Sequence, residues 1–282
     1  MRPSRLAVAL RLLGWVGLVA VLAIYVFPLY WLLNTSLKPR AELFASTPTL
    51  VAQQPTLEPY VSVLFDRGFV RLLGNSFLVC SLTVLLTLLI SLAITYPITR
   101  LPVSRRVRVG VLNWALSLRF LPPIAVVVPY FVVVHTVGLY NNPLALVFVY
   151  TLSNLPFGIW MLKGFLSEVP LELEEAAYVD GATRLVALRR ILLPLVAPGL
   201  LASSVIIFAF SWSEFLFALI LTSTRDAQTF PVGVQGLVTQ FEIIWNEMAA
   251  AGVIAIAVPL VLMVLARRYV LAGLTFGVIR DK

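Results

Sequence analysis

The residue types that carry most enzymatic chemistry are scarce and scattered in this chain of 282 residues. The only histidine, His135, and the only cysteine, Cys80, lie in apolar stretches, and we interpret both as structural. The lysines, which are Lys38, Lys163 and Lys282, do not fit the G-x4-G-K-[ST] loop that binds nucleotide phosphates. No group of histidine, cysteine and carboxylate residues has the spacing of metal ligands. The sequence therefore predicts no catalytic residue, no metal and no cofactor in this chain.

The densest set of small and charged residues at fixed spacing is the stretch 175–194, which reads EAAYVDGATRLVALRRILLP. The anchors of its pattern, E-A-A-x3-G-x9-I-x-L-P, are Glu175, Ala176, Ala177, Gly181, Ile191, Leu193 and Pro194. Ala177 and Gly181 are one helical turn apart, so they could form a smooth face against which another backbone presses closely. The stretch is either such a docking surface or a solvated connector between membrane spans.

The same stretch predicts a helix, a turn and a second helix outside the membrane. Pro170 suits the first turn of a helix, where its missing N–H does no harm. Gly181 can end that helix, and Thr183 can cap the next one. Asp180 and Arg184 are spaced at i and i+4 and could pair on a helix.

The composition places the rest of the chain in a bilayer. Hydrophobic residues make up 60% and charged residues 12%, with a mean hydropathy of +0.98, whereas soluble domains are about half apolar and a quarter charged. The net charge of +8 could suggest nucleic-acid binding. However, the basic residues sit in short segments between apolar runs, which is typical of the cytoplasmic side of membrane proteins. We therefore expect membrane lipid, and no nucleic acid, as a partner.

A membrane span needs about 20 mostly apolar residues, and the apolar runs predict an all-α membrane protein with six transmembrane helices in a single domain, residues 1–282. The predicted spans are about 12–33, 72–98, 109–136, 143–162, 196–222 and 247–266, with a loop at about 167–194. The first run is longer than a signal-peptide core, so we interpret it as a retained anchor. Pro194 should break or kink the second loop helix, and Pro198 should start the fifth span.

The distribution of Lys and Arg predicts the orientation of these spans. Fifteen of the 21 basic residues fall in the termini and the even-numbered loops, five fall on the other side, and Arg119 lies within a span. Because basic residues accumulate in the cytoplasm, both termini and the 167–194 loop are expected there. The two longest external segments are then Asn34–Phe69 and Arg225–Glu247.

The stretch 175–194 resembles the EAA loop of ABC-importer permeases, the segment by which such a permease binds its ATPase subunit. Residues 210–219, FSWSEFLFAL, are similar to the W-N-E-F-L-F-A-L signature of carbohydrate permeases of the MalG type, with Ser213 at the usual asparagine. Residues 268–277, RYVLAGLTFG, resemble the ending of the same branch, although residues 278–280 depart from it. The resemblance covers most of residues 70–282.

This resemblance implies a type I ABC-importer permease in the cytoplasmic membrane of a bacterium or archaeon. The first helix of the loop would be a coupling helix that docks in a cleft of the ATPase. The implied partners are a MalF-like second permease in a heterodimer, a homodimeric ATPase that binds ATP and Mg, and an extracytoplasmic sugar-binding protein. The residues implied in coupling to the ATPase are Glu175, Ala176, Ala177, Asp180, Gly181, Ile191 and Pro194.

Two charges lie inside predicted spans, Arg119 in the third and Glu214 in the fifth. Because a charge in the bilayer is costly, such residues usually face protein or a water-filled cavity. The two could line or gate a sugar path, or they could form a structural pair or reach an interface. Trp212 could stack on a sugar ring or belong to an interfacial aromatic belt. The candidate path residues are Arg119, Trp212, Ser213 and Glu214.

The function that these observations favour is the permease subunit of an ATP-driven importer, forming half of the path for a sugar, particularly a di- or oligosaccharide. One alternative is the same machinery for another solute, such as a glycerophosphodiester or a polyamine. The other is an ATPase-independent secondary transporter or channel. That class would be expected to show broken helices or charged pairs in inverted repeats, which the sequence does not reveal, and it would leave the stretch 175–194 unexplained.

Overall fold

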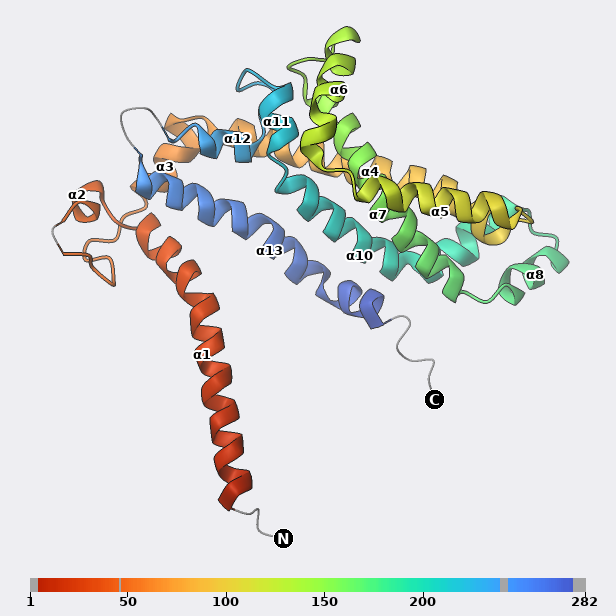
Figure 1. Cartoon of the computed structure of the whole chain (residues 1–282), viewed down its shortest axis with the longest axis horizontal. Coiled ribbons are helices and arrows are strands. Elements are labelled where there is room, and N and C mark those ends of the chain that lie inside the picture. Colours follow the sequence, from red (N-terminus) through yellow and green to blue (C-terminus); the bar gives the residue numbers. More distant parts are fainter. Residues whose placement is uncertain (1–4, 46, 239–242, 276–282) are drawn as a thin grey trace. The chain divides into compact units, whose positions relative to one another are not determined.

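The computed structural model describes residues 5–45, 47–238 and 243–275 of the chain. Within these ranges the regular elements are helices, with one isolated bridge between Val238 and Ile243, so the predicted all-α class is confirmed. The elements, labelled in Figure 1, are α1 (Arg5–Ser36), α2 (Arg40–Leu43), α3 (Glu58–Val61), η1 (Ser62–Asp66), α4 (Phe69–Arg100), α5 (Arg105–Arg119), α6 (Pro123–Thr136), α7 (Pro143–Glu168), α8 (Glu172–Val179), α9 (Arg184–Ala187), η2 (Leu188–Leu192), α10 (Leu193–Trp212), α11 (Leu216–Leu221), α12 (Phe230–Gln235) and α13 (Trp245–Thr275).

Five helical stretches of the described chain are long and apolar enough to cross a membrane. They are Arg11–Ser36, Phe69–Arg100, Pro143–Glu168, Arg184–Trp212 and Trp245–Tyr269. The helices α5 and α6, of 15 and 14 residues, are each too short and pass the same test only as a pair, whose axes are bent by 99°. The described residues therefore provide five spans, or six if the bent pair is one broken span.

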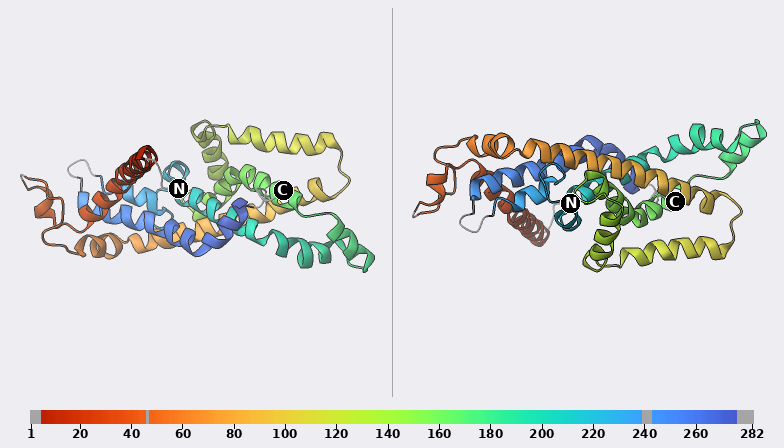
Figure 2. Two further views of the ribbon diagram at one scale, coloured as in Figure 1. Left: turned by 90° about the horizontal axis from the view of Figure 1, so that it is seen from below. Right: turned by 90° about the horizontal axis from the view of Figure 1, so that it is seen from above.

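Two of the predicted spans are interrupted. The third is divided where α5 ends at Arg119 and α6 begins at Pro123, and the bend between them is visible in Figure 2. Pro122 and Pro123 explain this break, since proline lacks an N–H and disfavours helical backbone in the residue before it. The predicted span 196–222 is also divided, because α10 ends at Trp212 and α11 begins only at Leu216.

The chain divides into two compact units, of which the second comprises Val70–Gly233 and Ala257–Lys282. Its central helix is α7, which is the most buried of the candidate spans and packs against α5, α10 and α11. Leu146 and Tyr150 of α7 are fully buried in a core that also contains Leu221 of α11. The buried helix α7 therefore supports the helices packed around it in this unit.

Two glycines allow close approach of helices in this unit. A Cβ atom at Gly158 of α7 would lie 2.3 Å from the Oγ of Ser91 on α4, and a Cβ atom at Gly199 of α10 would lie 2.4 Å from the ring of Phe165 on α7. The face of α4 toward this contact carries buried hydroxyl residues four positions apart, which are Thr83, Thr87, Ser91 and Thr95. Such seams of small residues are typical of helix packing within membranes.

The first unit comprises Met1–Phe69 and Val234–Ile256. Its polar segment is folded back on the end of α1 by side-chain to backbone hydrogen bonds: Asn34 Nδ2 donates to Leu50 O (3.0 Å), and Lys38 Nζ donates to Thr49 O. Glu42 accepts a hydrogen bond from the Thr49 hydroxyl, which lowers the pKa of the Glu42 carboxyl below its usual value. The described part of the predicted external segment 34–69 is therefore held against the end of α1 by specific hydrogen bonds.

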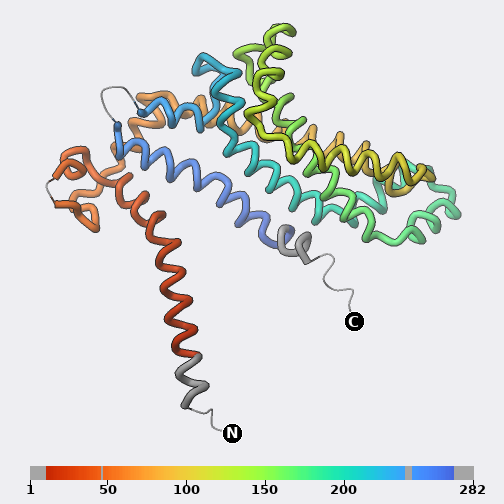
Figure 3. Tube along the Cα trace, viewed as in Figure 1, coloured from red at the N-terminus to blue at the C-terminus, as the bar shows by residue number. Residues whose placement is uncertain are grey.

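Two further features of the first unit concern its helices. Glu247, in the first turn of α13, accepts a hydrogen bond from Ser62 Oγ (3.0 Å) and forms an ion pair with Arg67. By contrast, the apolar window of α1, the long first helix traced in Figure 3, has none of its residues buried within the chain.

Candidate functional site

The helix–turn–helix predicted around residue 181 is formed by α8 and α9. The Ala182 amide donates to Ala177 O (2.9 Å) and the Gly181 amide donates to Tyr178 O (3.0 Å). These two bonds form a Schellman motif, which requires left-handed backbone at Gly181, and its φ is +82°. Thr183 is the N-cap of α9, and its side chain accepts an amide hydrogen bond. The predicted end of the first helix at Gly181 and the predicted cap of the second helix by Thr183 are confirmed.

The two faces of α8, which lies at one end of the second unit (Figure 1), have different surroundings. Glu174 and Ala177 are buried, whereas Glu175 and Ala176 are exposed, and Val179 is 88% exposed. Ala177, predicted on the docking face, instead packs inside its own chain because the rotation of the helix places it with Glu174. The surface that a partner can reach is therefore the face with Glu175, Ala176 and Val179.

The remaining positions of the pattern differ in part from expectation. Asp180 and Arg184 do not share a helix, and among the described residues no ion pair joins them. Ile191 lies partly buried in the π-helical turn η2. Pro194 does not break the segment, because it lies in the first turn of α10, directly after η2. Pro198 lies inside α10 rather than at its start, and Arg184–Trp212 passes as one candidate span.

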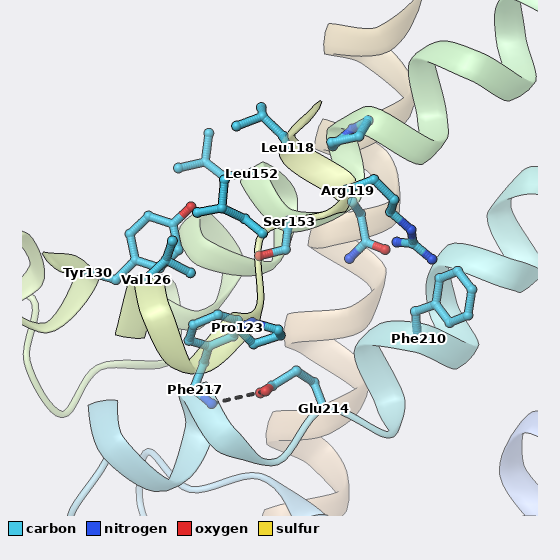
Figure 4. Close-up of a pocket in the computed structure, with 13 residues that line it drawn as sticks. Leu118, Arg119, Pro123, Val126, Tyr130, Leu152, Ser153, Phe210, Glu214 and Phe217 are labelled. Carbon is cyan, nitrogen blue, oxygen red and sulfur yellow. Dashed lines mark hydrogen bonds between the residues drawn. The ribbon is translucent and has the colours of Figure 1, made fainter. Parts of the chain in front are cut away.

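A cavity of about 490 Å³ lies within the second unit, between α5, α6, α7, α10 and α11 (Figure 4). Its polar lining comprises Arg119, Tyr130, Ser153, Asn154 and Glu214. Two of these, Arg119 and Glu214, were predicted as path residues. Ser153 and Asn154 were missed, although their position as adjacent polar residues in an apolar run of α7 was a usable signal. The cavity therefore offers hydrogen-bond donors and acceptors, one positive charge and one negative charge inside an otherwise apolar helical unit.

The two charges on this cavity do not pair. Glu214 accepts hydrogen bonds from the backbone amides of Phe217 (3.0 Å) and Ala218 (3.3 Å), so that its carboxylate caps the first turn of α11. The guanidinium carbon of Arg119 lies 5.2 Å from the ring centroid of Phe210, a cation–π contact (Figure 4). The break between α10 and α11 explains the difference, because it creates free amides that attract Glu214.

The other two candidate path residues are not among those that line the cavity. Trp212 is 4% exposed and packs in an aromatic cluster, with its ring centroid 5.8 Å from that of Phe208 and 5.5 Å from that of Phe77. Ser213 is exposed, and its hydroxyl donates to Ala209 O (2.9 Å). Trp212 is thus packed inside the unit, and Ser213 lies on its surface outside the cavity.

This geometry predicts that Arg119→Ala and Glu214→Ala have additive effects on uptake. Because the two side chains share no hydrogen bond or ion pair, removing one leaves no unpaired partner charge, so the double variant should show no rescue relative to the sum of the single effects. Glu214→Ala should also lower the unfolding temperature, since loss of a helix cap costs about 1 kcal/mol, and Glu214→Gln should lower it less because an acceptor oxygen remains. Uptake assays and thermal unfolding of the single and double variants measure both. A double variant clearly less impaired than the sum would show that the charges interact.

Comparison with known proteins assigns the chain to a family. Residues 10–275 match the model of the family described as binding-protein-dependent transport system inner membrane component. The trehalose/maltose transport system permease protein MalG of Thermococcus litoralis is 36% identical over 283 residues, covering 96% of this chain and 98% of that relative. The sulfoquinovosyl glycerol transport system permease protein SmoH of Agrobacterium fabrum is 36% identical over 251 residues, covering 89% and 87% respectively.

The fold agrees with this assignment. A bacterial ABC transporter involved in the import of the acidic polysaccharide alginate contains a chain that matches with a TM-score of 0.79 at 17% identity, covering 95% of this chain and 98% of that one. The overall fold of this chain therefore matches that of a chain in this ABC transporter. Since the family model spans nearly the whole sequence and the relatives match over most of their length, this chain is a member of the family of binding-protein-dependent transport system inner membrane components.

Proposed function

We propose that this chain is the permease subunit of an ATP-driven importer and forms half of the translocation path for a di- or oligosaccharide. The observation that carries the proposal is α8, a short helix with an exposed face of Glu175, Ala176 and Val179 that ends in a Schellman turn at Gly181. This turn fixes the end of α8, and the exposed face leaves the helix free to contact another subunit. Relatives named for trehalose/maltose and sulfoquinovosyl glycerol transport support a saccharide as the solute.

In this proposal α8 is the coupling helix and docks on a separate ATPase subunit, which binds ATP and Mg. The permease has no catalytic role of its own. Closure of the ATPase dimer on ATP would draw the coupling helices together and open the spans outward, and hydrolysis would return them. The acidic side chain of Glu175 on the exposed face suits a basic contact on the ATPase.

The cavity lined by Arg119, Tyr130, Ser153, Asn154 and Glu214 is the proposed contribution of this chain to the path. Its amide, hydroxyl and charged groups can exchange hydrogen bonds with sugar hydroxyls, while Phe210 and Phe217 supply apolar walls. The unburied α1 is proposed to contact lipid or a MalF-like second permease. The ordered segment around Glu42 and Lys38 would face the extracytoplasmic binding protein, with both termini in the cytoplasm of a bacterium or archaeon.

Purification tests this proposal. The tagged chain, extracted from its native membrane in a mild detergent, should co-purify with an ATPase that carries a phosphate-binding loop and with a second permease. Glu175→Lys reverses the charge on the exposed face of α8, and it should release the ATPase while the second permease stays bound. Glu58→Lys, an equal charge reversal at an exposed position of α3 in the first unit, serves as the control. Isolation of the wild-type chain with the second permease but without any ATPase would contradict the proposal.

A further inference from the structure

A buried ion pair joins the inner face of α8 to the body of the second unit. The side chain of Arg100, the last residue of α4, is 4% exposed, and that of Glu174 is 3% exposed. The distance between Arg100 Nε and Glu174 Oε1 is 2.9 Å. The same guanidinium donates from Nη2 to the carbonyl oxygens of Leu166 (2.6 Å) and Val169 (2.8 Å), at the end of α7. One side chain therefore connects α4, α7 and α8.

The guanidinium of Arg100 is surrounded by negatively polarised or charged groups, which are the carbonyl oxygens at the end of α7 and the carboxylate of Glu174. The last carbonyls of α7 have no partner in their own helix and lie at the negative end of its dipole, where a cation is favourable. Glu174 supplies the full negative charge that a buried arginine requires. Removing either charge would leave the other unpaired in a site with almost no access to water. The stability of each charged side chain in this site therefore depends on the other.

The ion pair determines which side of α8 faces outward. The helix has only eight residues, and its N-cap, Leu171, provides no side-chain cap. Its buried residues are Glu174 and Ala177, three positions apart on one face. Because neighbouring residues on a helix point about 100° apart, holding Glu174 inward places Glu175 on the exposed surface.

We propose that the Arg100–Glu174 ion pair is the mechanical connection between the coupling helix and the membrane spans, with both acting as positioning residues for Glu175. The proposal rests on the function proposed above, in which α8 docks on the ATPase. Movement of α8 on the ATPase is then transmitted through one guanidinium to α4 and to α7, the buried centre of the unit. The pattern of residues 175–194 contains neither Arg100 nor Glu174, so this connection is distinct from the docking surface itself.

The first test measures transported solute per ATP hydrolysed by the complete transporter in proteoliposomes. Glu174→Gln and Arg100→Lys should each lower this ratio about fivefold or more, while ATPase activity remains. Glu58→Gln, which removes an exposed carboxylate from α3 in the first unit, is the control and should leave the ratio unchanged. Arg100→Gln combined with Glu174→Gln should be less impaired than the product of the single effects, because no charge is then left buried alone.

A second test reads the position of α8 without requiring transport. A spin label on Val179→Cys, which is on the exposed face, reports the motion of the helix in the purified chain; native Cys80 is buried and is replaced by serine. The label should become more mobile with Glu174→Gln and not with Glu58→Gln. Unchanged mobility, or a transport ratio within about twofold of wild type in both Glu174→Gln and Arg100→Lys, would overturn the proposal. If the wild-type complex itself shows no ATP-dependent transport, the proposed function fails instead.

Discussion

Gly181→Val is expected to abolish uptake while the chain still reaches the membrane. Gly181 has a φ of +82°, and both hydrogen bonds of the Schellman turn depend on this conformation. Left-handed backbone costs an L-residue roughly 1–2 kcal/mol, and a β-branched side chain adds to this strain. Since 1.4 kcal/mol is a tenfold change in an equilibrium, the population of the docking conformation of α8 and α9, relative to relaxed alternatives, would fall about tenfold or more. Uptake by cells with equal amounts of membrane-inserted protein measures the effect.

Two further substitutions separate backbone strain from lack of space. Nothing lies within 4 Å of a Cβ atom built at Gly181, so the chain itself would accept a side chain there. If the turn conformation is decisive, Gly181→Asn should retain more uptake than Gly181→Ala, because asparagine adopts left-handed backbone more readily. The opposite order would mean that the ATPase surface excludes any larger side chain at this position, and the strain argument would then be wrong.

Gly199→Ala is expected to cause a large loss of folded protein. The added methyl carbon would lie 2.4–2.6 Å from three ring atoms of Phe165, whose side chain is buried against Val196 and Leu192. The ring cannot move away without displacing the buried residues packed around it. Such overpacking typically costs about 1–3 kcal/mol of folding free energy. A fluorescence-detected gel-filtration assay of thermal stability should show a markedly lower midpoint and less monodisperse protein.

The matched control for this prediction is Gly164→Ala, one residue from Phe165 along α7. Nothing lies within 4 Å of a Cβ atom built at Gly164, and alanine is favoured over glycine in a helix by about 1 kcal/mol. This variant should be as stable as the wild type or slightly more stable. Equal midpoints for Gly199→Ala and Gly164→Ala would show that the contact between α7 and α10 is loose.

The parts of the site that depend on local chemistry were predictable from the sequence. Gly181 ends α8 and Thr183 caps α9, because turn and cap preferences act over only a few residues. The apolar runs similarly predicted long helices such as α4 and α7. The breaks after Arg119 and Trp212 were not predicted, although Pro122 and Pro123 mark the first of them.

What the sequence could not specify is the rotation of each helix and the pairing of distant residues. Glu174 and Glu175 are chemically identical neighbours, yet one is buried against Arg100 and the other is exposed. Likewise, opposite charge suggested that Arg119 and Glu214 pair, but Glu214 caps α11 instead. Both outcomes depend on contacts between segments far apart in the chain, which neither periodicity nor composition determines.

The most direct test of the account is uptake of a labelled saccharide into proteoliposomes that contain this chain, its second permease and its ATPase, with the binding protein added outside. Uptake should require both ATP and the binding protein, and Gly181→Val should eliminate it while hydrolysis of ATP continues. Saccharide uptake that proceeds without the ATPase, for example on an ion gradient alone, would contradict the proposal that this permease is coupled to ATP through α8.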